Sequence, residues 1–582
     1  MQLSVKTGSR ERLLAILVIA IMAVFVARLF YLQIIQHDYY VRQANKEQVK
    51  QLVIPARRGE IYALDAGKPV KVVLNEAVYI VFVDPKVVDK PHEIIDLLRR
   101  VAGGNTRPHL EELLAQKQTR YQIVATKVTR KQAEMMKDKH LKGLGFQQVS
   151  QRVYPEGQLA AQTLGFVDAE GKGKYGIESA LNDRLTGQDG LLQSVTDISN
   201  VPLTIGDNNI NHPARNGDNV VLTIDRNVQA YAEKALADGL GRSHATNGSV
   251  MIMDPNSGKV LAMANLPTYK PAEYNKVQDV AAFNNGTISA PYEPGSDIKT
   301  LTVATGLDKG VIRPDSTYNN TDSIKVEDRT IVNATKGQTG VITMQHALNY
   351  SLNTGMVTIA QRLGDGSSIT RPARDTIYQY FHDKFGLGEL TGIELANEAE
   401  GTIIPPTDVD GGAVRYSNMA FGQGMDVTMV QVCAAFSTII NGGTYYPPTV
   451  LAGTMSDDGT AFTANQAKTA RPGMVSKGTS DTVREMIHQA RAAFYAAQDR
   501  PGYYTGGKTG TSQTIENGQY VDDQTVGTYL GFGGSSPSEL KYVIMVQVSG
   551  KHMNLAGNKD ALPIFTDISN WMLDYMKVQP KG

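Results

Sequence analysis

The sequence of 582 residues predicts an α+β fold, in which helices cover a sheet assembled from distant parts of the chain. Strand-like apolar runs occur at 220–225 and 249–253, and two more occur near the C-terminus at 528–532 and 542–548. The chain between these two groups has mostly helical periodicity. A polar, turn-rich stretch at 207–218 precedes the first run and marks the expected domain boundary.

The N-terminal region carries an apolar run long enough to cross a membrane. The run is uninterrupted from Leu13 to Ala27, and after Arg28 it resumes as far as Ile35. Basic residues precede it, which predicts a cytoplasmic N-terminus with the rest of the chain outside. A cleaved signal peptide is the alternative, but the triplets ending at Ala23 and Ala27 fit a small-residue cleavage site poorly. We therefore expect a retained, single-pass anchor.

Composition narrows the classes of function. Lysine plus arginine equals aspartate plus glutamate, at 58 each, so the charge balance does not favour a nucleic-acid partner. The single cysteine, Cys433, excludes an intrachain disulfide, and its apolar surroundings predict a buried structural thiol. The 10 histidines are scattered and no cluster has metal-ligand spacing, so no metal site is expected.

Between the anchor and the boundary the pattern is mixed. Residues 78–83 predict a strand, and 92–101 and 109–116 predict short helices separated by a Gly-Gly-Asn turn. The stretches 57–62 and 152–155 are compact and turn-bearing. None of these segments carries a motif for chemistry, and we expect no catalytic residue in this region.

The chain beyond the boundary adds further elements. A helix through Gln229 and Ala235 follows the first predicted strand. The turn Asp254-Pro255-Asn256-Ser257-Gly258 joins the second strand to a third at 259–263. Residues 560–576 predict a terminal helix that carries the only tryptophan.

A candidate nucleophile begins one of the helical patterns. Pro294 and Gly295 break the preceding pattern, and helical spacing starts at Ile298. Ser296 then lies in the first turn with Lys299 one turn later, on the same face. A lysine whose pKa is lowered by burial can take the proton of a serine nucleophile. Ser-x-x-Lys alone is common by chance, and a helix start with a solvated lysine is the alternative interpretation.

Two further motifs strengthen the functional interpretation. Ser351-Leu352-Asn353 lies between two helical patterns, and Lys508-Thr509-Gly510-Thr511 lies in a predicted edge strand. The three motifs in this order are the set found in penicillin-binding proteins and serine β-lactamases. Taken singly, each has a structural alternative: Ser351 as a helix cap, Asn353 as a turn residue and Lys508 as a solvated edge lysine.

With these motifs the chain resembles the class B penicillin-binding proteins, the monofunctional peptidoglycan D,D-transpeptidases, over almost its whole length. Other stretches that carry the resemblance are Arg58-Gly59-Glu60-Ile61, Arg152-Val153-Tyr154-Pro155, Gly176-Ile177-Glu178, Gly422-Gln423-Gly424 and Asn441-Gly442-Gly443. The resemblance implies a cytoplasmic tail and transmembrane anchor at 1–36, an elongated non-catalytic pedestal of the dimerisation type at 37–215, and a transpeptidase domain at 216–582. That domain would have an antiparallel sheet flanked by helices.

Within class B the motifs look more like the division type than the elongation type. The second motif has Asn353, where the elongation type usually has aspartate, and Glu293-Pro294-Gly295-Ser296 also fits the division type. Asp297 departs from the pattern, since a small or hydroxyl residue is more usual there. Ser512-Gln513 follows the third motif where the division type often differs, which leaves the subfamily open.

The resemblance also implies a role for each residue of the first two motifs. Ser296 would attack the carbonyl between two D-alanines of a stem peptide, and Lys299 would take its proton. Ser351 would relay a proton to the departing D-alanine. Asn353 would bind the substrate amide or help to hold Lys299. The acyl-enzyme would then pass to an amine of a neighbouring peptide, and β-lactams would acylate the same serine.

The third motif would bind the substrate. Lys508 would supply positive charge, and the hydroxyls of Thr509 and Thr511 would hold the substrate carboxylate. Backbone N–H groups of Ser296 and Thr511 would form the oxyanion hole. Gly510 would let the substrate backbone approach the strand. No metal or organic cofactor is implied, and the implied partners are a polytopic glycosyltransferase and division proteins.

Two other classes of function stay open. One is a serine hydrolase, either a D,D-carboxypeptidase or a β-lactamase, in which water replaces the amine; no deacylating glutamate can be assigned from the sequence. The other is a non-enzymatic β-lactam sensor or division scaffold that keeps the acylation site.

Overall fold

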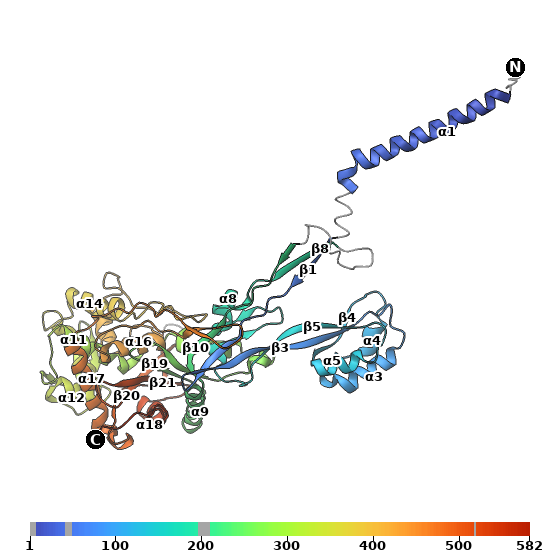
Figure 1. The fold of residues 1–582 in the computed structure, drawn as a ribbon. Helices are drawn as coiled ribbons and strands as arrows, with labels where there is room; N and C mark the ends of the chain where they lie inside the picture. The colour runs from blue at the N-terminus through green and yellow to red at the C-terminus, as the bar shows by residue number, and fades with distance from the viewer. Residues whose placement is uncertain (1–6, 41–48, 196–209, 517–518, 582) are drawn as a thin grey trace. The chain divides into compact units, whose positions relative to one another are not determined.

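The computed structural model describes residues 7–40, 49–195, 210–516 and 519–581 (Figure 1). The chain divides into two compact units, Met1–Arg58 with Thr186–Gly217, and Gly59–Leu185 with Asp218–Gly582. The predicted boundary stretch 207–218 lies partly outside the described residues, and the predicted domain limits stay a prediction.

The first unit contains the apolar N-terminal helix. Helix α1 (Thr7–Phe30) continues into a π-helical turn, η1 (Tyr31–Ile35). The span Arg10–Ile35 is long and apolar enough to cross a membrane, and its length and composition fit a single-pass membrane anchor. The same unit has a three-stranded antiparallel sheet of β1 (Val49–Ile54), β8 (Gly190–Val195) and β9 (Ile210–His212).

The N-terminal part of the second unit is built on one long strand. Strand β3 (Lys68–Val83) pairs first with β2 (Ile61–Asp65) and then with β4 (Gln122–Val128) and β5 (Leu144–Val153). The predicted strand 78–83 is therefore the end of a 16-residue strand. The predicted helices 92–101 and 109–116 are confirmed as α3 (Pro91–Val101) and α4 (Leu110–Ala115). These helices and α5 (Arg130–Lys137) share a hydrophobic core with the strands.

A buried ion pair joins three of the sequence motifs in this region. The Arg152 guanidinium donates to Glu178 at 2.7 Å, to the Gly59 carbonyl at 2.7 Å and to Asn75 at 3.0 Å. Both charged side chains are almost fully buried. An unpaired buried charge would be costly, so the three stretches depend on one another for stability.

The sheet of β2, β3, β4 and β5 continues into the C-terminal part of the chain. Strand β10 (Asn219–Asp225) lies antiparallel to β17 (Leu451–Met455) and parallel to β2. The order is β18-β17-β10-β2-β3-β4, with β18 at Phe462–Ala464. Strands from both sides of the predicted boundary therefore share one sheet.

The sheet that positions the site is five-stranded and antiparallel, in the order β12-β11-β21-β20-β19. Its strands are β11 (Asn247–Met253), β12 (Val260–Leu266), β19 (Tyr504–Glu516), β20 (Gln519–Gly534) and β21 (Leu540–Ser549). The predicted strands 249–253, 528–532 and 542–548 are confirmed in this sheet, and β19 is an edge strand as expected. The predicted strand 220–225 is confirmed as β10, but it belongs to the sheet that contains β2 and β17. The predicted terminal helix begins as a π-helical turn, η8 (Gly557–Ala561), and continues as α18 (Leu562–Tyr575).

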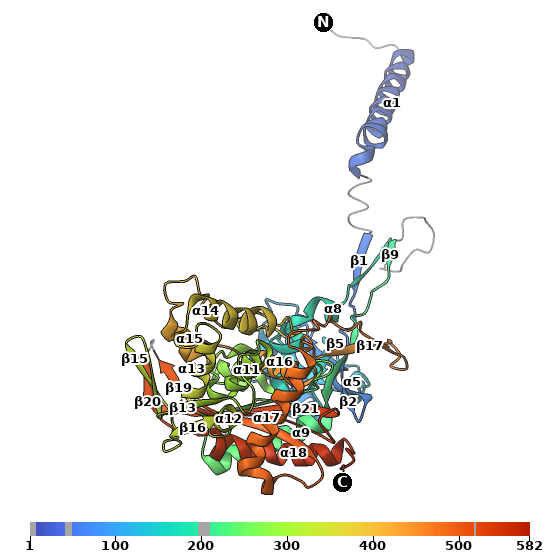
Figure 2. The ribbon, with the colours of Figure 1, turned by 90° about the vertical axis from the view of Figure 1, so that its left-hand side faces the viewer.

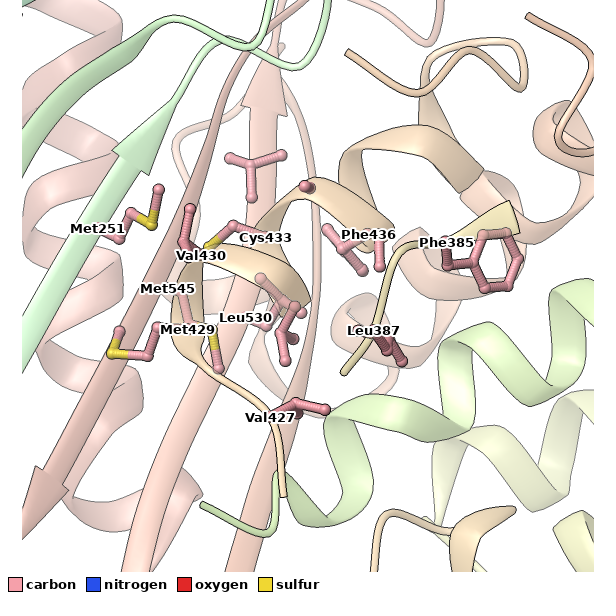
Figure 3. Close-up of a cluster of buried hydrophobic side chains, with 14 of the residues drawn as sticks. Met251, Phe385, Leu387, Val427, Met429, Val430, Cys433, Phe436, Leu530 and Met545 are labelled. Atoms are coloured by element: carbon pink, nitrogen blue, oxygen red, sulfur yellow. The ribbon is translucent and has the colours of Figure 1, made fainter. Parts of the chain in front are cut away.

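Helices cover both faces of this sheet because successive side chains on a strand point to opposite faces. Val250 and Ile252 pack on α9 (Arg226–Ser243) and α18, which lie side by side in Figure 2. Met251 and Met545 face the other side and pack against α16 (Met429–Ile440), as Figure 3 shows. Cys433 lies in this helix and is buried, which confirms the expectation of a buried thiol.

The remaining elements of the C-terminal part are helices and short strand pairs, and some of them carry residues that line the site. They are η3 (Pro271–Lys276), η4 (Val280–Phe283), α10 (Gly286–Ser289), η5 (Gly295–Ile298), α11 (Lys299–Asp308), β13 (Thr317–Asn320), β14 (Ser323–Val326), β15 (Arg329–Val332), β16 (Gly340–Thr343), α12 (Met344–Asn349), α13 (Asn353–Arg362), α14 (Arg371–Tyr378), η6 (Gln379–Lys384), α15 (Ala413–Met419), α17 (Lys477–Tyr495) and η7 (Ala496–Gln498). Short elements before β10 are η2 (Gly103–Asn105), α6 (Ala161–Leu164), β6 (Phe166–Val167), β7 (Gly173–Lys174), α7 (Gly176–Ala180) and α8 (Asn182–Thr186).

Candidate active site

Two glycines bring the candidate nucleophile against the edge of the sheet. Gly295 has φ +60° and donates its N–H to the Gly422 carbonyl at 2.8 Å. A Cβ on Gly295 would lie 2.8 Å from the Thr511 carbonyl, and one on Gly422 would lie 1.8 Å from the Gly295 carbonyl. Only glycine fits at both positions. Ser296 therefore lies in a 3₁₀ turn packed against β19, directly before α11.

Lys299 is the first residue of α11, and its side chain is buried. Its Nζ binds the Ser351 carbonyl at 2.6 Å, the Ser351 hydroxyl at 3.1 Å and the Asn353 amide oxygen at 2.7 Å. Burial lowers the pKa of Lys299 well below its usual value, and the charge of Lys508 lowers it further. The first and second motifs are thus joined through one amine that loses its proton easily.

The second motif is held in an unusual backbone conformation. Ser351 has φ +57°, and the next N–H, that of Leu352, donates to the Ala347 carbonyl at 2.8 Å. A non-glycine residue with positive φ is disfavoured, and functional sites are where such strain is found. Asn353 begins α13 and donates its amide N–H to the Val332 carbonyl at 2.8 Å, so the amide bridges Lys299 and the β14–β15 hairpin.

Lys508 reaches the same hydroxyl from the sheet. Its Nζ donates to Ser351 Oγ at 2.9 Å and to the Thr509 carbonyl at 2.9 Å. Burial lowers its pKa to about 8, and the charge of Asp297 opposes that effect. The hydroxyl of Ser351 therefore lies between two lysine nitrogens, one from the helical side and one from the sheet.

These residues line one cavity of about 650 Å³. Thr509 and Thr511 contribute from β19, as do Ser296, Lys299, Ser351, Asn353 and Lys508 from the motifs. The aromatic rings of Tyr350 and Phe494 also line it and pack edge to face, with centroids 5.2 Å apart. The structure brings all the predicted site residues together at this cavity or, for Gly510, directly beside it.

The structure adds a reason for glycine at position 510. A Cβ there would lie 2.1 Å from Thr528 Oγ1 and 2.9 Å from Asp297 Oδ2. Gly510 thus makes room for a buried carboxylate in the protein interior. Sequence reasoning did not give Asp297 a role; the only signal was that a charged residue is unusual there.

Asp297 itself is almost fully buried. Its Oδ2 accepts a hydrogen bond from Thr528 at 2.7 Å, while Oδ1 has no partner among the described residues. Burial raises its pKa to about 7, although the Thr528 hydroxyl and the Lys508 charge favour the ionised form.

A second buried charge supports the sheet behind the site. Arg491 of α17 binds Asp499 through two nitrogens, at 2.6 Å from Nη2 and 2.9 Å from Nε. It also donates to the hydroxyls of Tyr529 and Thr566, from β20 and α18. Tyr529 is the register partner of Thr509. No local sequence signal distinguishes Arg491 from other helical arginines. Within the described ranges, no group of three or more His, Cys, Asp or Glu could hold a metal ion.

Comparison with known families identifies this constellation. Residues 248–570 match the penicillin binding protein transpeptidase domain, and residues 53–222 match the penicillin-binding protein dimerisation domain. The chain belongs to the penicillin-binding protein transpeptidase family. This penicillin-binding protein therefore combines a dimerisation-type pedestal and a cell-wall transpeptidase domain, as the class B resemblance predicted.

Several proteins are similar to it over nearly their whole length. It is 28% identical to stage V sporulation protein D of Bacillus subtilis, over 98% of this chain and 87% of that protein. It is 26% identical to the peptidoglycan D,D-transpeptidase FtsI of Escherichia coli, over 98% of this chain and 92% of that one. The structure of penicillin binding protein 3 of Mycobacterium tuberculosis with aztreonam has 25% identity and a TM-score of 0.67, and covers 91% of this chain and 98% of that one.

Proposed function

We propose that this penicillin-binding protein is a serine-type peptidoglycan D,D-transpeptidase that works through an acyl-enzyme on Ser296. The observation that carries the proposal is the buried amine of Lys299, held by Ser351 and Asn353 one turn after Ser296. A buried lysine with a lowered pKa can act as a base near neutral pH. The names of relatives such as the D,D-transpeptidase FtsI support the substrate class.

Acylation follows from this geometry. Ser296 Oγ forms a bond to the carbonyl carbon between two D-alanines, and its proton passes to the neutral amine of Lys299. The C–N bond to the terminal D-alanine then breaks, and the departing amine takes a proton. The Ser351 hydroxyl is placed to deliver that proton, because both lysine nitrogens lie within 3.1 Å of it.

A neutral Lys299 fixes the direction of this relay. A neutral amine has two N–H donors and one lone pair. The Ser351 carbonyl and the Asn353 amide oxygen can only accept, so they use both donors. The lone pair is then left for one hydroxyl proton, that of an approaching Ser296, and the protonated amine can donate to Ser351.

Transfer reverses the same steps with a different nucleophile. An amine of a second stem peptide attacks the ester carbonyl, the bond to Ser296 Oγ breaks, and Ser296 regains its proton. Lys508 and the hydroxyls of Thr509 and Thr511 hold the carboxylate of the donor peptide during acylation. Backbone N–H groups of Ser296 and Thr511 stabilise the oxyanion.

The protein is further expected to have its catalytic domain outside the cytoplasm and to work with a membrane-embedded partner. The basic residues before the apolar span favour an N-terminus in the cytoplasm and a catalytic domain outside it. Cross-linking requires glycan strands, so a membrane-embedded, polytopic glycosyltransferase is the expected partner. A role in septal synthesis is supported by the similarity to FtsI and by Asn353 in the second motif.

The test measures acylation of the full-length protein by a fluorescent penicillin. Ser296→Ala should abolish covalent labelling. Lys299→Arg should slow acylation by roughly 100-fold to 10,000-fold, because arginine keeps the charge and cannot act as a base. Lys309→Arg, at the exposed end of the same helix, is the matched control and should acylate normally. Labelling on another residue, or near-normal acylation of Lys299→Arg, would refute the mechanism.

Product analysis separates transpeptidation from its alternatives. Purified protein given a lipid-linked glycan strand should yield cross-linked dimers of stem peptides, detected by mass spectrometry. Release of D-alanine without dimers would instead indicate a carboxypeptidase, and acylation without any turnover would indicate a sensor or scaffold.

A further inference from the structure

We propose that Asp297 is a positioning residue of this active site: its buried carboxylate keeps Lys508 protonated, and so extends acylation to higher pH. This inference rests on the proposed function. It concerns a residue with no contact to the cavity and no assigned role. The charge of Lys508 matters because it attracts the substrate carboxylate and feeds a proton to Ser351.

The carboxylate of Asp297 is buried beside the strand that carries the third motif. Asp297 follows Ser296 in the 3₁₀ turn, and its side chain reaches the sheet beside Gly510, where the hydroxyl of Thr528 donates to one carboxylate oxygen. The other oxygen has no hydrogen-bond partner among the described residues. A buried carboxylate that is only half satisfied needs a nearby positive charge to remain ionised.

The positive charge must come from one of the titratable groups around Asp297. Three titratable groups act on Asp297 or respond to it: Tyr292 before η5, Cys433 of α16 and Lys508 of β19. Burial keeps the tyrosine and the thiol neutral, because it raises the pKa of both. Lys508 is therefore the one cation among these partners.

Asp297 and Lys508 are close enough for their charges to interact, although no hydrogen bond joins them. The ammonium is hydrogen-bonded to Ser351 and Thr509, so it is already directed toward the cavity. Gly510 is two positions from Lys508 on β19, so both face the same side of the sheet, and Asp297 acts on Lys508 through space from that side, where Gly510 lacks a Cβ. Charges interact strongly across such a buried gap because the local dielectric is low.

The effect of Asp297 on Lys508 also reaches Lys299. Asp297 raises the pKa of Lys508 against the effect of burial, to about 8. The charge on Lys508 in turn lowers the pKa of Lys299. Keeping Lys508 charged therefore also keeps Lys299 neutral and ready to act as a base. One carboxylate thus supports opposite protonation states in two neighbouring lysines.

The test compares pH profiles of the acylation rate constant, using full-length protein in detergent and a fluorescent penicillin. Asp297→Asn removes the charge but keeps an oxygen for Thr528. Its alkaline limit should move to lower pH by about one unit, since an opposite charge nearby shifts a pKa by one unit or more. Thr528→Val removes the hydrogen bond but keeps the charge, and its alkaline limit should stay in place.

Either of two outcomes in these variants would overturn the inference. One is an unchanged alkaline limit in Asp297→Asn; the other is an equal shift in Asp297→Asn and Thr528→Val, which would indicate packing and not charge. If Asp297→Asn does not fold, Asp297→Ser is measured instead. In a Lys508→Arg background the alkaline limit should disappear, and Asp297→Asn should then cause no further shift. A shift that persists there would also refute the role. Failure of the proposed function would be seen in a different measurement, because the Ser296→Ala variant would then still be labelled by penicillin.

Discussion

Replacing Arg491 with methionine should destabilise the transpeptidase domain, although Arg491 is not itself among the residues that line the cavity. Methionine fills a similar volume but leaves the Asp499 carboxylate without its bidentate partner. It also leaves the buried hydroxyl of Tyr529 without the donor that holds it. Because Tyr529 is paired with Thr509, the loss also reaches the strand that carries the third motif.

The magnitude follows from the burial of the pair. Arg491 is 1% exposed, and the side chain of Asp499 is 17% exposed. Removing one partner of a buried ion pair costs about 3–5 kcal/mol. One kcal/mol lowers the melting temperature of a large domain by roughly 2–4 °C. We therefore expect a decrease of about 10 °C.

The assay uses the single tryptophan as a local reporter. Trp571 lies in α18 and stacks on Tyr231 and Tyr575, with ring centroids 4.2 Å and 4.7 Å away. Its fluorescence follows thermal unfolding of this domain in the full-length protein. The double variant Arg491→Met with Asp499→Leu should recover much of the loss, because neither charge is left unpaired. A loss below 1 kcal/mol in the single variant, or a double variant worse than the sum of the singles, would contradict the reasoning.

Three further predictions follow from the site. Burial raises the pKa of Asp297 from 3.8 to about 7, so ionisation of Asp297 lowers the stability of the native protein as the pH rises between these two values. The stability of Asp297→Asn relative to the native protein should therefore grow by about 4 kcal/mol between pH 4 and pH 8. A difference in urea unfolding that stays constant over this pH range would disprove this. Gly422→Ala should lose penicillin labelling, because its Cβ would meet the Gly295 carbonyl at 1.8 Å; normal labelling kinetics would show that the turn can relax. Asn353→Ala should slow acylation at least 10-fold at neutral pH by freeing Lys299, and stopped-flow rates equal to the native protein would exclude this anchoring.

The sequence predicts most of what depends on local spacing. Ser296 and Lys299 are one turn apart, and the breaks around Ser351 mark the join between α12 and α13. The fold class follows from apolar periodicity in the same way. The length of β3 does not, because Asn75 and Glu76 interrupt its apolar pattern, and pairing with Arg152 and Gln151 of β5 maintains the strand there.

What the sequence does not predict depends on contacts between distant residues. Asp297 and Thr528 are 231 positions apart; Asp297 is one of the two unspecified positions of the first motif, and Thr528 belongs to no motif. The close approach of Gly295 to Gly422 likewise requires the folded backbone. Arg491 has the pattern of an ordinary helical arginine until Asp499, Tyr529 and Thr566 surround it.

The parallel pairing of β2 with β10 has a consequence for how the chain is made. Glu60 binds the side chain of Asn219, and 159 residues separate them. During synthesis, β2 emerges long before its partner, so one side of that strand stays unpaired while the intervening segment folds. An open strand edge is a site of aggregation, so the chain is exposed to aggregation until β10 has been made. Slowing translation between 65 and 219 should therefore reduce the yield of folded protein more than slowing it after β10.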